Sequence, residues 1–138
     1  MSDPSPAAVV QRQLDAYNQR DLDALLATYA EHARQYQHPA TLAASGAAQI
    51  RQRMGLRFEE SDLHARLVQR AVMGNIVIDQ EVVTRNFPEG LGEVDVVAIY
   101  EVIDGKIASA SVQVSNKRLK NIFQSGSDLQ AEETLTKI

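Results

Sequence analysis

The sequence contains no cysteine, which excludes disulfide bonds, thiolate catalysis and cysteine-ligated zinc sites. It also lacks any run of about 18 apolar residues, the length needed to cross a bilayer as a helix. The first residues, Met-Ser-Asp-Pro-Ser-Pro, lack the basic and apolar segments of a secretory signal. We therefore expect a soluble, cytoplasmic protein without a membrane partner.

Positive charge is also in short supply, because 14 Lys and Arg stand against 18 Asp and Glu. A net charge of -4 argues against nucleic acid or an anionic membrane as the main partner. His32, His38 and His64 show none of the short spacings typical of a metal site, and no Gly-rich phosphate loop or Gly-x-Ser-x-Gly motif is present. The sequence predicts no bound metal and no cofactor.

The period of the apolar residues changes near Ser61, and this change is the most informative feature that is present. Before it, apolar residues recur three or four positions apart; after it, they alternate or run continuously to about Ser115. At 138 residues the chain fits one domain with one core. Helices followed by a strand meander predict a single α+β domain over residues 1–115, in which a curved antiparallel sheet packs on three N-terminal helices.

The first half contains signals for three helices. Ser5 and Pro6 begin the first, and Asp21 caps the second. The expected inward residues are Val10, Leu14 and Tyr17 in the first helix, and Leu22, Leu25, Leu26 and Tyr29 in the second. Residues 32–45 have no sustained period and are expected to form a loop or a short extended piece.

A third helix is expected to begin after Gly46. Ala47, Ile50 and Met54 would face inward. The residues expected to face mostly water are Arg51, Gln52, Arg53 and Arg57.

Four antiparallel strands are expected in the second half. The Gly74-Asn75 and Asp104-Gly105 pairs predict tight hairpin turns, since both accept the positive φ that such turns require. The first strand would begin near Leu63, and the other three would occupy residues 76–86, 93–103 and 106–115. Residues 116–138 form a polar extension, read either as a short helix beginning at Ser127 or as a disordered tail.

Several segments resemble one superfamily. They are Tyr17–Leu25, Tyr29–Ala33, Gly46–Ile50, Gly74–Glu81 and Val97–Ile107. In order and composition they are similar to the nuclear-transport-factor-like α+β cone superfamily, which includes ketosteroid isomerases, SnoaL-like polyketide cyclases and scytalone dehydratases. The two segments of the second half look like a SnoaL-like, steroid isomerase-like branch of bacterial proteins, and the whole resemblance spans roughly residues 7 to 115. It implies a cone-shaped fold with an internal pocket.

The resemblance also places the isomerase's catalytic positions on this chain. The tyrosine position falls on Gln13 and the oxyanion aspartate on Ala98, while the base position falls near Gln37-His38-Pro39. Ketosteroid isomerisation needs a carboxylate base and an oxyanion hole of hydroxyl and carboxylic acid. We therefore expect no 3-ketosteroid isomerase activity, and His38 is the one residue at these positions that could still act as a base.

His38 is accordingly the candidate acid/base residue, because imidazole titrates near neutrality. The alternative is a loop histidine that bonds to water or backbone. Tyr17 and Tyr29 lie on predicted helix stripes, so each is either a core residue or a hydroxyl that points into the pocket.

The strand from Ile76 has two faces that both carry apolar residues. The resemblance places Gln80 inside the cone, where its amide would bind a ligand carbonyl; otherwise it is a satisfied, semi-buried amide. Asp79, Glu81 and Arg85 share the other face, and cross-strand ion pairing or a dimer surface explains them better than catalysis does.

The sequence therefore predicts a small, largely apolar ligand in the cone. The predicted lining is Tyr17, Tyr29, His38, Met54, Gln80 and Tyr100. The enzyme hypothesis is cofactor-free isomerase, cyclase or dehydratase chemistry with His38 as base; the alternative is a non-catalytic ligand-binding or dimerisation module. A homodimer is expected through the outer sheet face that carries Val97, Ile99 and Ile103.

Overall fold

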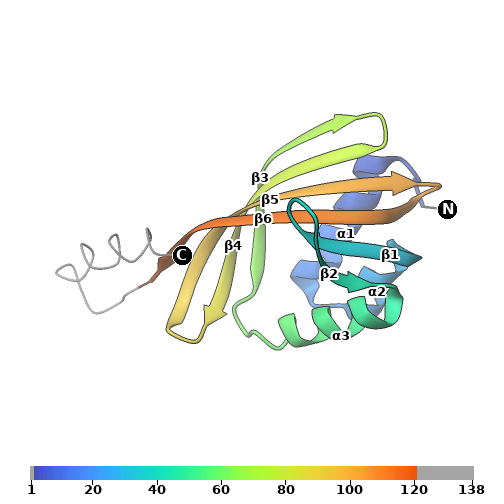
Figure 1. Cartoon of the computed structure of the whole chain (residues 1–138). Coiled ribbons are helices and arrows are strands. Elements are labelled where there is room, and N and C mark those ends of the chain that lie inside the picture. Colours follow the sequence, from blue (N-terminus) through green and yellow to red (C-terminus); the bar gives the residue numbers. More distant parts are fainter. Residues whose placement is uncertain (1, 121–138) are drawn as a thin grey trace.

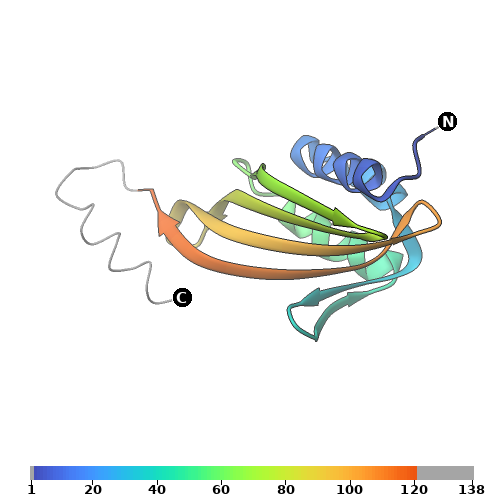
Figure 2. The ribbon, with the colours of Figure 1, turned by 90° about the horizontal axis from the view of Figure 1, so that it is seen from above.

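A computed structural model describes residues 2–120, which form three helices and six strands. In chain order the elements are α1 (Pro6–Gln19), α2 (Leu22–Ala27), β1 (Tyr29–Gln37), β2 (Thr41–Ser45), α3 (Ala47–Arg57), β3 (His64–Met73), β4 (Ile76–Phe87), β5 (Gly90–Ile103) and β6 (Lys106–Leu119). The strands make a curved, open sheet, and the helices gather on one side of it (Figures 1 and 2). This arrangement confirms the predicted cone-shaped α+β fold.

The first two helices begin where the sequence predicts, although the Ser5 side chain makes no capping hydrogen bond. Ser5 is extended immediately before Pro6, and α1 ends at Gln19, after which Arg20 has a left-handed φ of 53°. The Asp21 carboxylate accepts the backbone N–H of Ala24 at 3.0 Å, which caps α2. The inward side of α1 buries Val9, Val10, Gln13, Leu14 and Ala16.

Tyr29 does not lie on a helix stripe as predicted. It is the first residue of β1, which pairs in parallel with β6 and opposes Tyr29 to Ile107. The backbone pairing available along β6 outweighs the helical pattern of the preceding leucines, and α2 ends at Ala27. Residues 32–45 likewise form most of the β1–β2 hairpin, so the shorter extended piece expected there is in fact a pair of strands.

The sheet order is β2-β1-β6-β5-β4-β3, with β1 and β6 as its parallel pair. Strands β3 to β6 form the predicted antiparallel meander. Gly74, Asp104 and Gly105 have φ values of 58°, 51° and 75°, as the hairpin turns require. Strand β6 continues four residues past its expected end, with Arg118 opposite Glu93. The short helix considered from Ser127 lies outside the described residues.

The two faces of β4 are reversed relative to the prediction. Val77, Asp79, Glu81 and Val83 are buried under the helices, whereas Gln80 is exposed on the outer face. The register explains the reversal: Glu81 opposes Val96 and Asp79 opposes Ala98, and directly opposed residues share a face. The sequence analysis placed Val97, Ile99 and Ile103 of β5 on the outer face, which is right. The buried Val96, Ala98 and Tyr100 of the same strand fix which side of β4 points inward.

The outer face of the sheet keeps several apolar side chains in contact with solvent. Ile78, Val97 and Ile103 are 39%, 38% and 47% exposed. This places the residues named for the dimer on the outer face, and homodimer formation stays a prediction. Within residues 2–120 no helix has the length and apolar character needed to cross a membrane.

Candidate functional site

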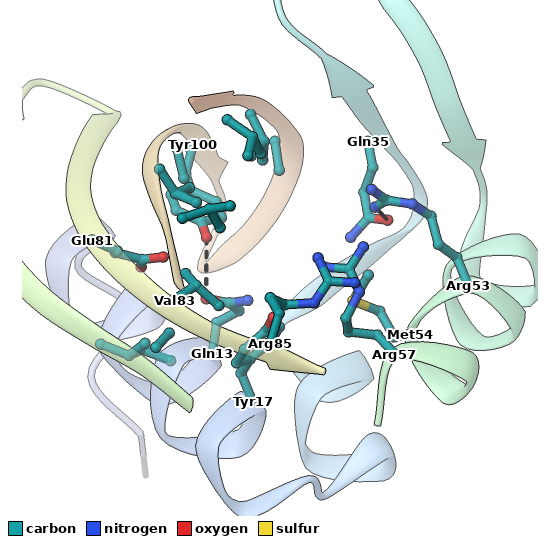
Figure 3. A pocket seen from close by; sticks show the side chains of 18 of the residues that line it. Gln13, Tyr17, Gln35, Arg53, Met54, Arg57, Glu81, Val83, Arg85 and Tyr100 are labelled. Carbon is teal, nitrogen blue, oxygen red and sulfur yellow. Dashed lines mark hydrogen bonds between the residues drawn. The ribbon is translucent and has the colours of Figure 1, made fainter. Parts of the chain in front are cut away.

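A pocket lies between the inner face of the sheet and helices α1 and α3 (Figure 3). Its cavity volume is about 90 Å³. Small apolar side chains of β5 and β6 form one wall: Val94, Val96, Ala98, Ala110 and Val112. Leu14 and Met54 contribute further apolar surface from the helices. The enclosure suits the apolar body of a small molecule.

Glu81 is the acidic residue of the lining. Its side chain comes from β4, and the residue is only 7% exposed. Burial, and then the negative charge of Asp79, raise the pKa of Glu81 to about 7, although Arg70 acts in the opposite direction. Within residues 2–120 its carboxyl group has no hydrogen-bond partner, so Glu81 presents an unpaired, titratable group to the pocket.

Asp79 lies two residues earlier on the same face but is fully paired. Arg70, directly opposite on β3, donates to both of its carboxylate oxygens at 2.7 and 2.9 Å. Arg70 also donates to the Gln11 side chain at 2.9 Å, which ties the sheet to α1. The predicted cross-strand ion pair is therefore right for Asp79 and wrong for Glu81.

Three tyrosines line the same cavity. The Tyr100 hydroxyl donates to Gln13 Oε1 at 3.3 Å, and Gln35 Nε2 donates to the Tyr29 hydroxyl at 3.2 Å. Burial, followed by the charge of Glu81, raises the pKa of Tyr100 well above its ordinary value. Burial raises the pKa of Tyr29 to about 12. These hydroxyls therefore stay protonated and can donate hydrogen bonds at neutral pH.

Tyr17 packs against Phe58 at the side of the pocket near the arginines. Its ring meets Phe58 edge to face, with 5.6 Å between the ring centroids. Burial raises its pKa, against the lowering effect of the charges on Arg57 and Arg85. The positive charges of the site are therefore close to Tyr17.

Arg53, Arg57 and Arg85 also line the pocket, and their guanidinium groups gather on the side away from Glu81 (Figure 3). Arg53 and Arg57 were predicted to face water, which is wrong: α3 is turned so that both reach the cavity beside Met54. Arg53 Nη1 donates to Gln35 Oε1 at 2.8 Å. Arg85 forms a bidentate pair with Glu60, at 2.8 and 2.7 Å.

The structure brings together four of the six predicted lining residues: Tyr17, Tyr29, Met54 and Tyr100. Gln80 is on the outer face. His38 lies in the turn between β1 and β2, exposed and outside the lining, with Nδ1 3.2 Å from Ser111 Oγ. Gln13 and Ala98, placed at catalytic positions by the resemblance, do line the pocket.

Sequence reasoning missed Glu81 and the three arginines. For Glu81 the sequence did contain a signal, a carboxylate on a strand with apolar neighbours. Its burial could be predicted only with the strand register, which pairs Glu81 with the inward-facing Val96. No group of acidic residues and histidines within residues 2–120 is arranged to hold a metal ion.

The fold is shared with many solved structures. A cystatin-fold protein from Novosphingobium aromaticivorans aligns with a TM-score of 0.73 at 22% identity, over 78% of this chain and 97% of that chain. A protein from Sinorhizobium meliloti described as a polyketide cyclase aligns with a TM-score of 0.64 at 24% identity, over 76% and 93%. A protein from Kribbella flavida described as a ketosteroid isomerase aligns with a TM-score of 0.69 at 15% identity, over 87% and 81%.

No protein with a curated description matches the chain. The sequence itself, however, matches the SnoaL-like domain over residues 10–110, from the inward face of α1 to the middle of β6. This match covers most of the elements that build the pocket, and the shared fold agrees with it. The chain is therefore a member of the SnoaL-like domain family.

Proposed function

We propose that this protein is a cofactor-independent enzyme that moves a proton on a small, largely apolar molecule, in an isomerase, cyclase or dehydratase reaction. Glu81 is the acid/base residue in this proposal. The observation that carries it is a buried, unpaired carboxyl group that opens on an apolar pocket among three tyrosines. The similar proteins described as a polyketide cyclase and a ketosteroid isomerase support a small-molecule substrate.

The chemistry follows from the positions of the groups. Glu81 would remove a proton from carbon next to a carbonyl and return it at another atom of the same molecule. Tyr29 accepts from Gln35 and keeps its own hydroxyl proton, so it would donate a hydrogen bond to the carbonyl oxygen as negative charge develops there; Tyr100 could do so only by exchanging its bond to Gln13. The valine and alanine wall excludes water, which strengthens both interactions. A pKa of about 7 lets the Glu81 carboxyl act in either direction near neutral pH.

His38 is the weaker candidate for the same role. It was chosen from the resemblance, but it lies in an exposed turn outside the pocket lining. A base must reach the proton that it removes, either directly or through one water molecule. Glu81 already lies in the cavity.

The test follows deuterium uptake from D₂O by NMR into a panel of enolisable cyclic ketones and β-keto acids. Glu81→Gln keeps the shape of the side chain and removes its titrating group, so the exchange rate should fall by about 10²- to 10⁴-fold. Glu59→Gln, an exposed change, is the matched control. An exchange rate in Glu81→Gln that equals the wild-type rate would contradict the assigned role of Glu81.

A second reading is a non-catalytic ligand-binding module. Gln13 and Ala98 favour it, because neither supplies the acidic donor that the isomerase mechanism needs at these positions. A panel compound that binds the wild-type protein without any deuterium uptake would favour this reading over the catalytic one.

A further inference from the structure

One side of the pocket carries more positive charge than the protein itself balances. Arg53, Arg57 and Arg85 all reach this side (Figure 3). Among residues 2–120, Glu60 is the one carboxylate that forms ion pairs with any of the three. Three guanidinium charges therefore share a single carboxylate.

Glu60 is already occupied by Arg85 and the backbone. Its two oxygens accept from Arg85 at 2.8 and 2.7 Å, and Oε1 also accepts the Asn86 N–H at 2.8 Å. Arg57 Nε is 3.7 Å from Glu60 Oε2, beyond hydrogen-bond distance. The Arg57 side chain is only 27% exposed, so solvent compensates its charge incompletely.

The positive charge of Arg53 is compensated even less than that of Arg57, because no carboxylate among residues 2–120 forms an ion pair with it. Its hydrogen bond runs to the neutral side-chain oxygen of Gln35, a residue that is 4% exposed. Burial, and then the positive charge of Arg57, lower the pKa of Arg53, because its surroundings disfavour the charged form. Gln35 also donates to Tyr29, so the Arg53 guanidinium is held in place by a buried chain of hydrogen bonds.

From these two incompletely balanced guanidinium groups, of which Arg53 is held by Gln35, we infer that the substrate carries a carboxylate, bound by Arg53 and Arg57. This inference rests on the proposed function and names its substrate class: a small organic acid whose apolar body lies along the β5–β6 wall. Guanidinium groups bind carboxylates through two parallel hydrogen bonds, which fix orientation as well as position. With its acid end held there, the opposite end of the ligand would extend toward Glu81.

A carboxylate suits this site better than a larger anion. It is flat, as is the guanidinium fork, whereas a phosphate group is tetrahedral and carries a third terminal oxygen. The cavity of about 90 Å³ must also accommodate the apolar body. The Arg53 guanidinium lies on the side of the pocket away from Glu81, so the acidic residue does not compete for this anchor (Figure 3).

The test measures the binding of benzoate, benzamide and phenylphosphonate to the full chain by calorimetry. Benzoate should bind at least about tenfold more tightly than benzamide, because a charge-assisted bond to a buried guanidinium is among the stronger hydrogen bonds. Arg53→Gln or Arg57→Gln should weaken benzoate binding by about 10- to 100-fold and leave benzamide binding unchanged. Arg51→Gln is the matched control, since Arg51 lies on the same helix but pairs with Asp23 at the surface.

Several results would overturn the inference. These are equal binding of benzoate and benzamide, no benzoate binding at millimolar concentration, tighter binding of phenylphosphonate, or an equal loss in Arg51→Gln. If Arg53→Gln fails to fold, Arg53→Lys carries the comparison, because it keeps the charge and loses the planar fork. Glu81→Gln separates the two proposals: benzoate preference that persists in this variant supports the anchor even if the exchange assay excludes Glu81 as the base.

Discussion

Asp79 and Glu81 stand two residues apart on one buried face of β4, yet their environments are opposite. Asp79 is fully buried and bound at both oxygens by Arg70. Glu81 is nearly as buried but has no partner among the described residues, and its pKa is raised to about 7. A buried carboxylate is costly unless it is paired. The difference indicates that Asp79 serves the fold, whereas Glu81 is kept at a cost to stability and is available for chemistry.

The largest expected effect comes from breaking the ion pair between Asp79 and Arg70. Asp79→Asn leaves the Arg70 charge beneath the helices without its anion, and the free energy of unfolding should fall by about 3 kcal/mol. Denaturant unfolding measures this. Asp23→Asn, which breaks the exposed pair with Arg51, should cause little change.

The double variant Arg70→Leu/Asp79→Leu sharpens this prediction. Removing both charges avoids leaving either one buried alone, so it should destabilise less than Asp79→Asn does. A loss in the double variant that equals or exceeds that of the single variant would contradict the ion-pair explanation and point to packing at this position.

The unpaired carboxyl group should instead make stability depend on pH. The folded chain holds the Glu81 proton up to about pH 7, whereas an unperturbed glutamate releases it near 4.5. The folded state therefore binds more protons between these values, and the free energy of unfolding falls as pH rises through them. Over this window wild type should lose about 3 kcal/mol relative to Glu81→Gln.

This prediction is measured as a difference between two unfolding series, so contributions from other titrating groups largely cancel. Below pH 4.5 and above pH 7 the difference should be flat. A difference that is constant at every pH would show that the pKa of Glu81 is not raised in the folded chain.

Much of the fold could be predicted from the sequence, but the inward face of β4 could not. The starts of α1 and α2, the hairpin turns and the two faces of β5 could be predicted from the sequence, because each depends on local geometry or simple alternation. On β4 both faces carry apolar residues, with Val77 and Val83 on one and Ile78 and Val82 on the other. Alternation therefore could not decide which face points inward, and the choice depends on pairing with β5.

The arginines were missed for a related reason. Arg53 lies beside the buried Met54 on α3, and a helical pattern treats a charged residue there as part of the solvent face. A pocket changes that rule, because a long side chain at the edge of the stripe can turn its charged end into the cavity. The Arg53 guanidinium lies where Gln35 of β1 accepts its hydrogen bond, and the position of β1 relative to α3 cannot be read from the helical pattern.

The smallest expected effect concerns His38, a titratable group whose surroundings resemble those of neither carboxylate. It is exposed, and its imidazole Nδ1 lies 3.2 Å from Ser111 Oγ. An exposed hydrogen bond adds little to stability because water replaces it. His38→Gln should therefore leave the thermal midpoint within about 1 °C of wild type. It should also leave deuterium exchange intact, since the side chain lies outside the pocket lining. The decisive comparison is between His38→Gln and Glu81→Gln in one deuterium exchange assay. If exchange is lost in His38→Gln and kept in Glu81→Gln, His38 is the base. Glu81 is then a buried, unpaired acid that takes no part in the chemistry.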